Sequence, residues 1–188
     1  MMYIDSVDIP LSGGISDESL RLIKSTLTEV KFDKGHLLID ETKLEKNAYI
    51  LKKGTIRSFI RKAEKEITFW FAQEGDIINS SFGYLYNKKG YENYQLLEDC
   101  ILYKIDILEM RALYATNLEI CNWSRTITEL EAMKLEKRYL DYILLTPEER
   151  YLDIFENKPD LFQRVALKEI ASFMGVSPVS LSRIRARI

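Results

Sequence analysis

The sequence predicts an α+β protein in which a small β-barrel or jelly roll is followed by one long helix and a pair of short helices. Three observations predict this class. Short segments rich in aromatic and β-branched residues, bounded by turn residues, recur over residues 32–105. Over residues 118–145 the apolar residues follow the helical period instead. Residues 167–188 carry the start and stop signals of two short helices.

The barrel is predicted from strands that recur at steady intervals. A short helix capped by Ser16 precedes it, and we expect this helix to use Leu20, Ile23 and Leu27 as its apolar face and to end near Val30. Strands are then expected at residues 32–39, 49–60, 66–72, 75–78, 94–97 and 100–105. The spacing of Gly35, Gly54 and Gly75 suggests the corner turns of such a barrel.

Helical signals resume after residue 105. Asp106 is expected to cap a short helix that runs through Leu113, and a long helix follows over residues 118–145. That helix would be about 40 Å long, more than a small barrel can cover, so we expect it to pair with a second copy of the chain. The alternative is a helix packed only on its own barrel. The stripe expected to form the dimer contact is Ile120, Trp123, Ile127 and Leu130.

A capping box marks the start of the C-terminal region. Thr146 is expected to cap a helix over residues 147–156, with Pro147 at its first position and Glu149 reaching back to the cap. This boundary predicts three units: a sensor barrel (1–116), a long dimerisation helix (117–145) and a C-terminal helical domain (146–188).

The last two helices have the pattern of a helix-turn-helix. Ala171 is small where the helices would cross, and Gly175 can adopt the positive φ that ends the first helix. Ser177 and Pro178 fit the cap and first position of the second helix. The residues expected to face inward are Ile170, Met174, Val176, Leu181, Ile184 and Ile188.

The outward face of the second helix is small, polar and basic, which favours DNA. Arg183 suits guanine, Val179 a thymine methyl, and Ser182 a base edge or phosphate. Residues 161–188 carry a net charge of +4 in a chain of net charge −2. The alternative is an ordinary domain end with solvated arginines. The predicted DNA-binding residues are Lys168, Ser177, Pro178, Val179, Ser180, Ser182, Arg183, Arg185 and Arg187.

Composition argues against several other classes of protein. No apolar run approaches the length of a membrane span, and the N-terminus lacks a signal-peptide pattern, so we expect a cytoplasmic protein. Cys100 and Cys121 have no paired spacing and are expected to be reduced thiols. His36 is the only histidine, and no nucleophile elbow or phosphate-binding glycine loop is present. We therefore expect no enzyme activity, no metal and no cofactor.

The order of these elements resembles the CRP/FNR family of bacterial transcription regulators. The most specific match covers residues 169–184, and residues 47–57, 75–78 and 97–102 support it. The resemblance implies a double-stranded β-helix (jelly-roll) barrel like a cyclic-nucleotide-binding domain, and a winged-helix-like C-terminal domain. It also implies a homodimer that binds promoter DNA, with RNA polymerase as a further partner. Many relatives continue into a β-hairpin wing beyond the position of Ile188, so we expect the wing to be short or absent, or the chain to be cut there.

Departures from the family pattern argue against cyclic AMP. Members that bind it carry an arginine for the phosphate, whereas no arginine lies between Arg61 and Arg111 here, and Gly90 and Tyr91 take its place. Too few cysteines and histidines remain for an iron–sulfur or haem sensor. Val179 stands where many members have glutamate, while Ser182 and Arg183 are retained.

Two interpretations of the barrel and its tail stay open. Aromatic residues could line a pocket for a less charged effector, or their side chains could fill a pocket that no longer binds a ligand. The residues expected to line an effector pocket are Ser80, Ser81, Phe82, Tyr91 and Tyr94. The first interpretation of the whole chain is a dimeric transcription regulator that senses an unidentified effector or none. The alternative is a small-molecule or protein-binding barrel whose helical tail serves assembly.

Overall fold

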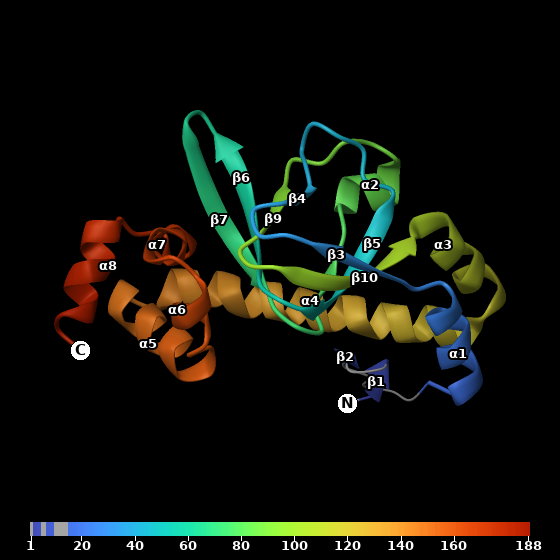
Figure 1. The fold of residues 1–188 in the computed structure, drawn as a ribbon. Coiled ribbons are helices and arrows are strands. Elements are labelled where there is room, and N and C mark those ends of the chain that lie inside the picture. Colours follow the sequence, from blue (N-terminus) through green and yellow to red (C-terminus); the bar gives the residue numbers. More distant parts are fainter. Residues whose placement is uncertain (1, 5–6, 10–14) are drawn as a thin grey trace.

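The computed structural model describes residues 2–4, 7–9 and 15–188 (Figure 1). Residue 1, where the predicted sensor unit begins, lies outside this part. Within it, two four-stranded antiparallel sheets have the orders β3-β10-β5-β8 and β4-β9-β6-β7, and β1 (Met2–Ile4) pairs with β2 (Val7–Ile9). The strands of the larger sheets are β3 (Thr28–Phe32), β4 (Leu37–Ile39), β5 (Asn47–Lys53), β6 (Ile56–Lys62), β7 (Lys65–Ala72), β8 (Ile77–Ile78), β9 (Asn93–Leu96) and β10 (Cys100–Asp106).

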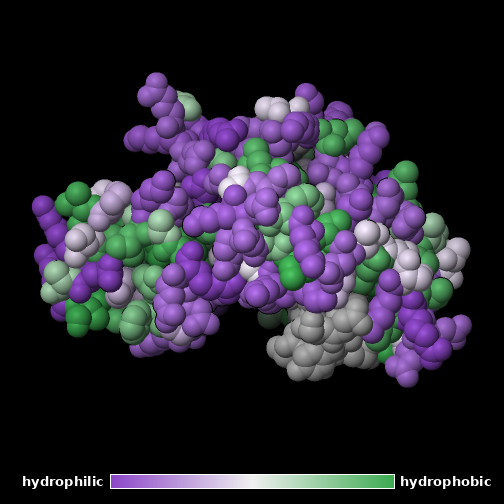
Figure 2. All heavy atoms as spheres, in the orientation of Figure 1, coloured by the Kyte–Doolittle hydropathy of each residue, from purple (hydrophilic) through white to green (hydrophobic). Residues whose placement is uncertain are grey.

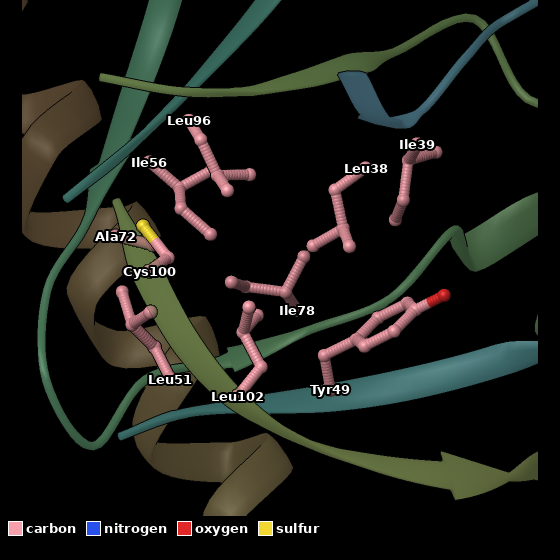
Figure 3. Packing of buried hydrophobic residues seen from close by; sticks show 10 residues of the cluster. All are labelled: Leu38, Ile39, Tyr49, Leu51, Ile56, Ala72, Ile78, Leu96, Cys100 and Leu102. Carbon is pink, nitrogen blue, oxygen red and sulfur yellow. The ribbon is translucent and has the colours of Figure 1, made fainter. Parts of the chain in front are cut away.

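The main apolar core lies between the two sheets, where side chains from both converge (Figure 3). Leu51, Ile56 and Leu102 are fully buried there. Every predicted strand region contains a strand in the structure. The alternation of apolar and polar residues along these strands is what lets each sheet bury one face.

The expected corner glycines do turn the chain. Gly35, Gly54 and Gly75 have φ values of 87°, 122° and 93°, a region that residues with a Cβ rarely adopt. Gly54 has a second reason to lack a side chain, because an added Cβ would overlap Sγ of Cys100. Cys100 is buried and Cys121 partly buried, and both are free thiols, as predicted.

Helices cover the outer face of the β3-β10-β5-β8 sheet and form a second apolar core with it. These are α1 (Asp17–Ser25), α3 (Ile107–Thr116) and the first half of α4 (Leu118–Leu144) (Figure 1). Ser16 and Asp106 cap α1 and α3 as predicted. The predicted end of the first helix near Val30 is wrong, because residues 28–32 form β3 and Val30 pairs with Leu102. Strand pairing satisfies the backbone there and suits the β-branched residues of this segment.

The long helix α4 has two different halves. In the first half Ile120, Trp123 and Ile127 are buried in the chain's own core, and Leu130 is partly buried. The predicted dimer contact requires an exposed stripe for a second copy. These residues do not form one. In the second half the exposed large apolar side chains are Met133, Leu135, Tyr139, Leu140, Tyr142, Ile143 and Leu144.

The C-terminal helices form a third core with one strand of the second sheet. They are α5 (Pro147–Asn157), α6 (Leu161–Arg164), α7 (Leu167–Met174) and α8 (Pro178–Arg185). The capping box of Thr146 and Glu149 is present, as predicted. Phe71 of β7 joins this core, so the helices pack directly on the sheet. Neither α6 nor α2 (Ser81–Tyr86) was predicted, because each is too short to show a helical period.

No helix in the described ranges is long and apolar enough to cross a membrane. Among the same residues, no three His, Cys, Asp or Glu side chains gather in a way that could hold a metal ion.

Candidate nucleic-acid interface

The turn between α7 and α8 is built as its residue types predict. Gly175 ends α7 with a φ of 72°, and the N–H of Val176 donates to the carbonyl of Ala171 at 3.0 Å. Two residues later the hydroxyl of Ser177 accepts the N–H of Ser180 at 3.0 Å and caps α8, with Pro178 at its first position. Two local signals thus fix where one helix stops and the next starts.

The inner faces of the two helices meet in the third core. Ile170, Ala171, Met174, Leu181 and Ile184 are each at most 4% exposed. Ala171 is fully buried, as expected where the helices cross, and Val176 is partly buried. Ile188 was expected to face inward but is exposed, because α8 ends at Arg185 and the residues after it leave the helical path.

The residues predicted to contact DNA lie on the outside of this pair. Val179 is 60% exposed, and Ser180 alone in the set is only partly exposed. In Figure 2 the C-terminal helices, at the left, show hydrophilic and hydrophobic residues side by side. The exposed members of the predicted set are Lys168, Ser177, Pro178, Val179, Ser182, Arg183, Arg185 and Arg187.

Charge on this surface is largely unpaired. Among the described residues, Arg183 and Arg185 form no ion pair; Lys168 lies 3.4 Å from Glu169, and Arg187 lies 3.6 Å from Glu148. The side chains of Lys168 and Arg187 are each more than 70% exposed, so these ion pairs contribute little to stability and can open. The outer face of α8 therefore offers free positive charge.

One basic residue counted in the sequence argument is not part of this surface. Arg164 lies 2.7 Å from both Glu74, in the turn after β7, and Glu98, in the turn after β9. Its hydrogen bond to Glu74 raises the pKa of the guanidinium against the effect of burial. Its charge is neutralised within the chain, and this pairing joins α6 to the barrel.

Helix α7 packs directly on strand β7 of the β6–β7 hairpin (Figure 1). The hydroxyl of Ser172 accepts the backbone N–H of Thr68 at 2.9 Å and donates to the carbonyl of Glu66 at 3.2 Å. The ring of Phe173 lies 5.0 Å from that of Phe71. Since α7 is fixed to the sheet in this way, the position of α8 depends on the sheet as well.

Two arginines bind the last carbonyls of α7, and the sequence analysis missed them. Arg138 of α4 donates to the carbonyl of Phe173 at 2.8 Å, and Arg150 of α5 donates to that of Met174 at 3.4 Å. A cation at a helix C-terminus is favourable because the last carbonyls lack helical partners. No local pattern reveals such contacts, since the partners are 35 and 24 residues apart.

The predicted effector residues surround α2 and the strand after it. Ser80 is buried and caps α2, while Ser81 is exposed. The rings of Phe82 and Tyr91 meet edge to face at 5.7 Å, and both are substantially exposed. Tyr94 is partly buried, and burial raises its pKa. The structure thus brings two of the predicted rings into contact and places Ser80 next to Gly90.

A buried carboxylate lies beside these residues and was not predicted. Glu92 is 4% exposed, and its Oε1 atom has no hydrogen-bond partner among the residues described. A Cβ on Gly90 would lie 2.6 Å from the other carboxylate oxygen, so only glycine fits above it. Asn93 is fully buried, and its side-chain amide nitrogen also lacks a partner in the described part of the chain. This corner of the barrel therefore contains a buried acceptor and a buried donor atom without partners in the described chain.

Comparison with known proteins rests on structure. No family model and no curated protein matches the sequence. The regulator CLP of Xanthomonas campestris, described as c-di-GMP responsive, matches with a TM-score of 0.72 at 13% identity over 92% of this chain and 91% of its own. A putative CRP/FNR regulator from Eubacterium rectale matches with a TM-score of 0.72 at 13% identity, over 92% and 83% of the two chains. FixK2 of Bradyrhizobium japonicum gives 0.70 at 15%, over 86% and 83%.

The chain has the CRP/FNR fold. The arginines nearest in sequence to α2 already have partners within the chain. Arg57 is buried 2.6 Å from Glu66, Arg61 lies 3.2 Å from Glu41, and the guanidinium of Arg111 donates to the carbonyl of Tyr84. None is left to receive a phosphate group next to Tyr91.

Proposed function

We propose that this chain is a dimeric DNA-binding transcription regulator of the CRP/FNR type. The observation that carries the proposal is the outer face of α8, where Val179, Ser182 and Arg183 are exposed on a helix whose inner face is packed and whose start is capped. A helix presented in this way fits the major groove, with its first turns toward the base edges.

The proposal assigns a role to each predicted unit. Residues 1–116 form a jelly-roll sensor barrel, residues 117–145 the dimerisation helix, and residues 146–188 a domain whose α7 and α8 are the helix-turn-helix. Arg183 and Ser182 contact base edges, while Arg185, Arg187 and Lys168 contact phosphates and set the register. Promoter DNA is the expected partner, with RNA polymerase as a further one.

Dimerisation is proposed to use the second half of α4. Its face toward the body of the chain is charged: Lys134 pairs with Asp76 and Arg138 contacts Phe173. On the opposite face Leu135 and Tyr139 are 55% and 65% exposed, and Leu140 and Ile143 are 45% and 55% exposed. Apolar side chains at helical spacing with no cover in the described chain are suited to a coiled-coil contact with a second copy.

The sensor is proposed to respond to something other than a cyclic nucleotide, or to no ligand. The buried carboxylate of Glu92 would repel a phosphodiester, and Arg57, Arg61 and Arg111 are already engaged within the described chain. No residue set suited to catalysis emerged from the sequence, so we assign the chain no enzyme activity.

Selection from random double-stranded DNA tests the proposal and requires no assumed operator. The purified chain is expected to enrich a sequence with two related half-sites about one helical turn apart. Fluorescence anisotropy on that sequence should show affinity that falls steeply as salt rises. Failure of the parent chain to enrich any sequence at low salt would contradict the proposal.

Variants separate contacts made by α8 and the residues after it from the effect of general charge. Arg183→Ala combined with Arg187→Ala should abolish binding to the enriched sequence. Lys62→Ala is the control, since Lys62 is an exposed basic residue at the tip of the β6–β7 hairpin. Undiminished binding by the double variant would show that α8 is not the reading helix and would favour an assembly role for the helical tail.

A further inference from the structure

A cleft of about 480 Å³ lies where the barrel, the long helix and the C-terminal helices meet. Its walls come from β7 and the turn after it, from the second half of α4, from α5, and from the end of α7. This volume lies within the range of sites for small molecules, about 300–1,000 Å³. The cleft is on a different part of the molecule from the α2 segment, and neither the predicted effector residues nor the predicted DNA-binding residues line it.

Each acidic side chain of the cleft already has an ion-pair partner. Each of the four has a lysine or arginine within ion-pair distance: Asp76 with Lys134 at 3.4 Å, Asp141 with Lys137 at 2.5 Å, Asp153 with Lys137 at 3.6 Å and Glu74 with Arg164 at 2.7 Å. Lys137 is shared by Asp141 and Asp153, and in the described part of the chain none of the four carboxylates lies within ion-pair distance of another cation of the cleft.

Three cations of the cleft have no such partner. In the described part of the chain no carboxylate lies within ion-pair distance of Arg138, Arg150 or Lys158. Arg138 donates to the carbonyl of Phe173, and Arg150 donates to carbonyls only, with its buried Nε left without a hydrogen-bond partner. The helix-end carbonyls thus accept hydrogen bonds from only part of the two guanidiniums. They accept none from the ammonium of Lys158.

The same cations are partly buried and close enough for their charges to interact. Burial, and then the nearby charge of Arg150, lower the pKa of Arg138 to about 10. Burial also lowers the pKa of Lys158. Positive groups that lose hydration and repel one another are stabilised by an anion placed between them.

Two aromatic rings complete the wall beside these charges. The guanidinium of Arg138 lies 3.5 Å from the ring centre of Phe173, and the ammonium of Lys158 lies 5.4 Å from that of Trp70. Flat apolar surface next to unpaired cations matches a ligand that combines a ring with an anionic group.

We propose that this cleft binds a small organic anion with a flat ring, whose anionic group is held by Arg138 and Lys158 and whose ring lies against Trp70. Such a ligand would touch the barrel, α4 and the C-terminal helices at once. This binding goes beyond the proposed DNA-binding function and does not depend on it, so it is tested without DNA.

Isothermal titration calorimetry with 1-naphthyl phosphate tests the site, with 1-naphthol as the neutral counterpart. We expect one naphthyl phosphate per chain and binding of 1-naphthol at least about tenfold weaker, because the cations contribute charge-assisted hydrogen bonds. Arg138→Gln and Lys158→Gln should each weaken naphthyl phosphate about tenfold, the effect of losing one such bond. Lys62→Gln makes the same charge change outside the cleft and should bind as the parent does.

Three results would overturn the proposal: no binding of naphthyl phosphate to the parent at millimolar concentration, equal binding of 1-naphthol, or parent-like affinity in both cleft variants. Arg138 also holds the end of α7, so the fold of Arg138→Gln is checked by circular dichroism. If that variant does not fold, Lys158→Gln decides the question, because within the described chain Lys158 forms hydrogen bonds through its backbone only.

Discussion

The guanidinium of Arg57, in the second sheet, lies 3.9 Å from the carboxylate of Glu169 on α7, and both side chains are less than 10% exposed. Arg57 also bonds to Glu66 and Gln95 at 2.6 and 2.9 Å and lies over the ring of Phe59. This pair links the barrel to the helix that positions α8. Charges buried at such a boundary are costly unless each keeps its partner.

Removal of Arg57 should therefore destabilise the chain strongly. Arg57→Met is expected to lower the free energy of unfolding by about 2–4 kcal/mol, because Glu169 is left buried with only the exposed Lys168 as a counter-charge. Urea denaturation followed by circular dichroism measures it. Arg61→Met, in the same strand, is the control: Arg61 is 44% exposed, and its loss should cost less than about 1 kcal/mol. Equal effects of the two variants would show that the buried pair does not stabilise the fold.

Any side chain at Gly175 is expected to destabilise the fold. Gly175→Ala should lower the free energy of unfolding by about 1–2 kcal/mol for the left-handed backbone alone. A further loss should come from the new Cβ, which would lie 3.1 Å from the ring of Tyr142. A double-mutant cycle with Tyr142→Ala isolates that contact, and Gly175→Ala should cost less in the Tyr142→Ala background. An identical cost in both backgrounds would rule the contact out.

Stability should fall in acid partly through Glu119. Hydrogen bonds from the hydroxyls of Ser16 and Ser19 and from the backbone N–H of Ser16 lower the pKa of Glu119 below its ordinary value of 4.5. A carboxylate with a lowered pKa in the folded state stabilises it above the unfolded pKa, and this contribution is lost as pH falls through the folded value.

Thermal unfolding at pH 6 and at pH 3 measures this effect. Glu119→Gln should be less stable than the parent at pH 6, and its Tm should fall less between the two pH values. Glu156→Gln, an exposed acid on α5, should keep the parent's pH dependence. A parent-like slope for Glu119→Gln would contradict the role given to this contact between α1 and α4.

The exposed apolar face of α4 should control assembly. Leu140→Glu combined with Ile143→Glu is expected to convert a dimer into a monomer of 22.0 kDa, because like charges would meet across the contact. Size-exclusion chromatography with light scattering gives the mass. Asn122→Glu adds charge to the first half of α4 at an exposed position and should leave the dimer intact. A parent chain that is monomeric at every concentration would contradict the dimer itself.

Much of the fold follows from local sequence patterns. Gly35, Gly54 and Gly75 marked the corners, and the caps at Ser16, Asp106, Thr146 and Ser177 marked where helices begin. The turn at Gly175 and the outer face of α8 were predicted in the same way. These features depend on residues a few positions apart, so the sequence shows them directly.

Contacts between distant residues were decided only by the tertiary structure. Ile120, Trp123 and Ile127 had a correct helical period, yet a period does not say which surface a helix covers, and they cover the chain's own sheet. The end of α1 was predicted too far along the chain, because residues 28–32 pair with β10 instead of continuing the helix. Arg57, Glu169, Arg138 and Arg150 are ordinary charged residues in sequence. Only the packing of α7 against β7, α4 and α5 buries them, and burial is what makes their charges matter.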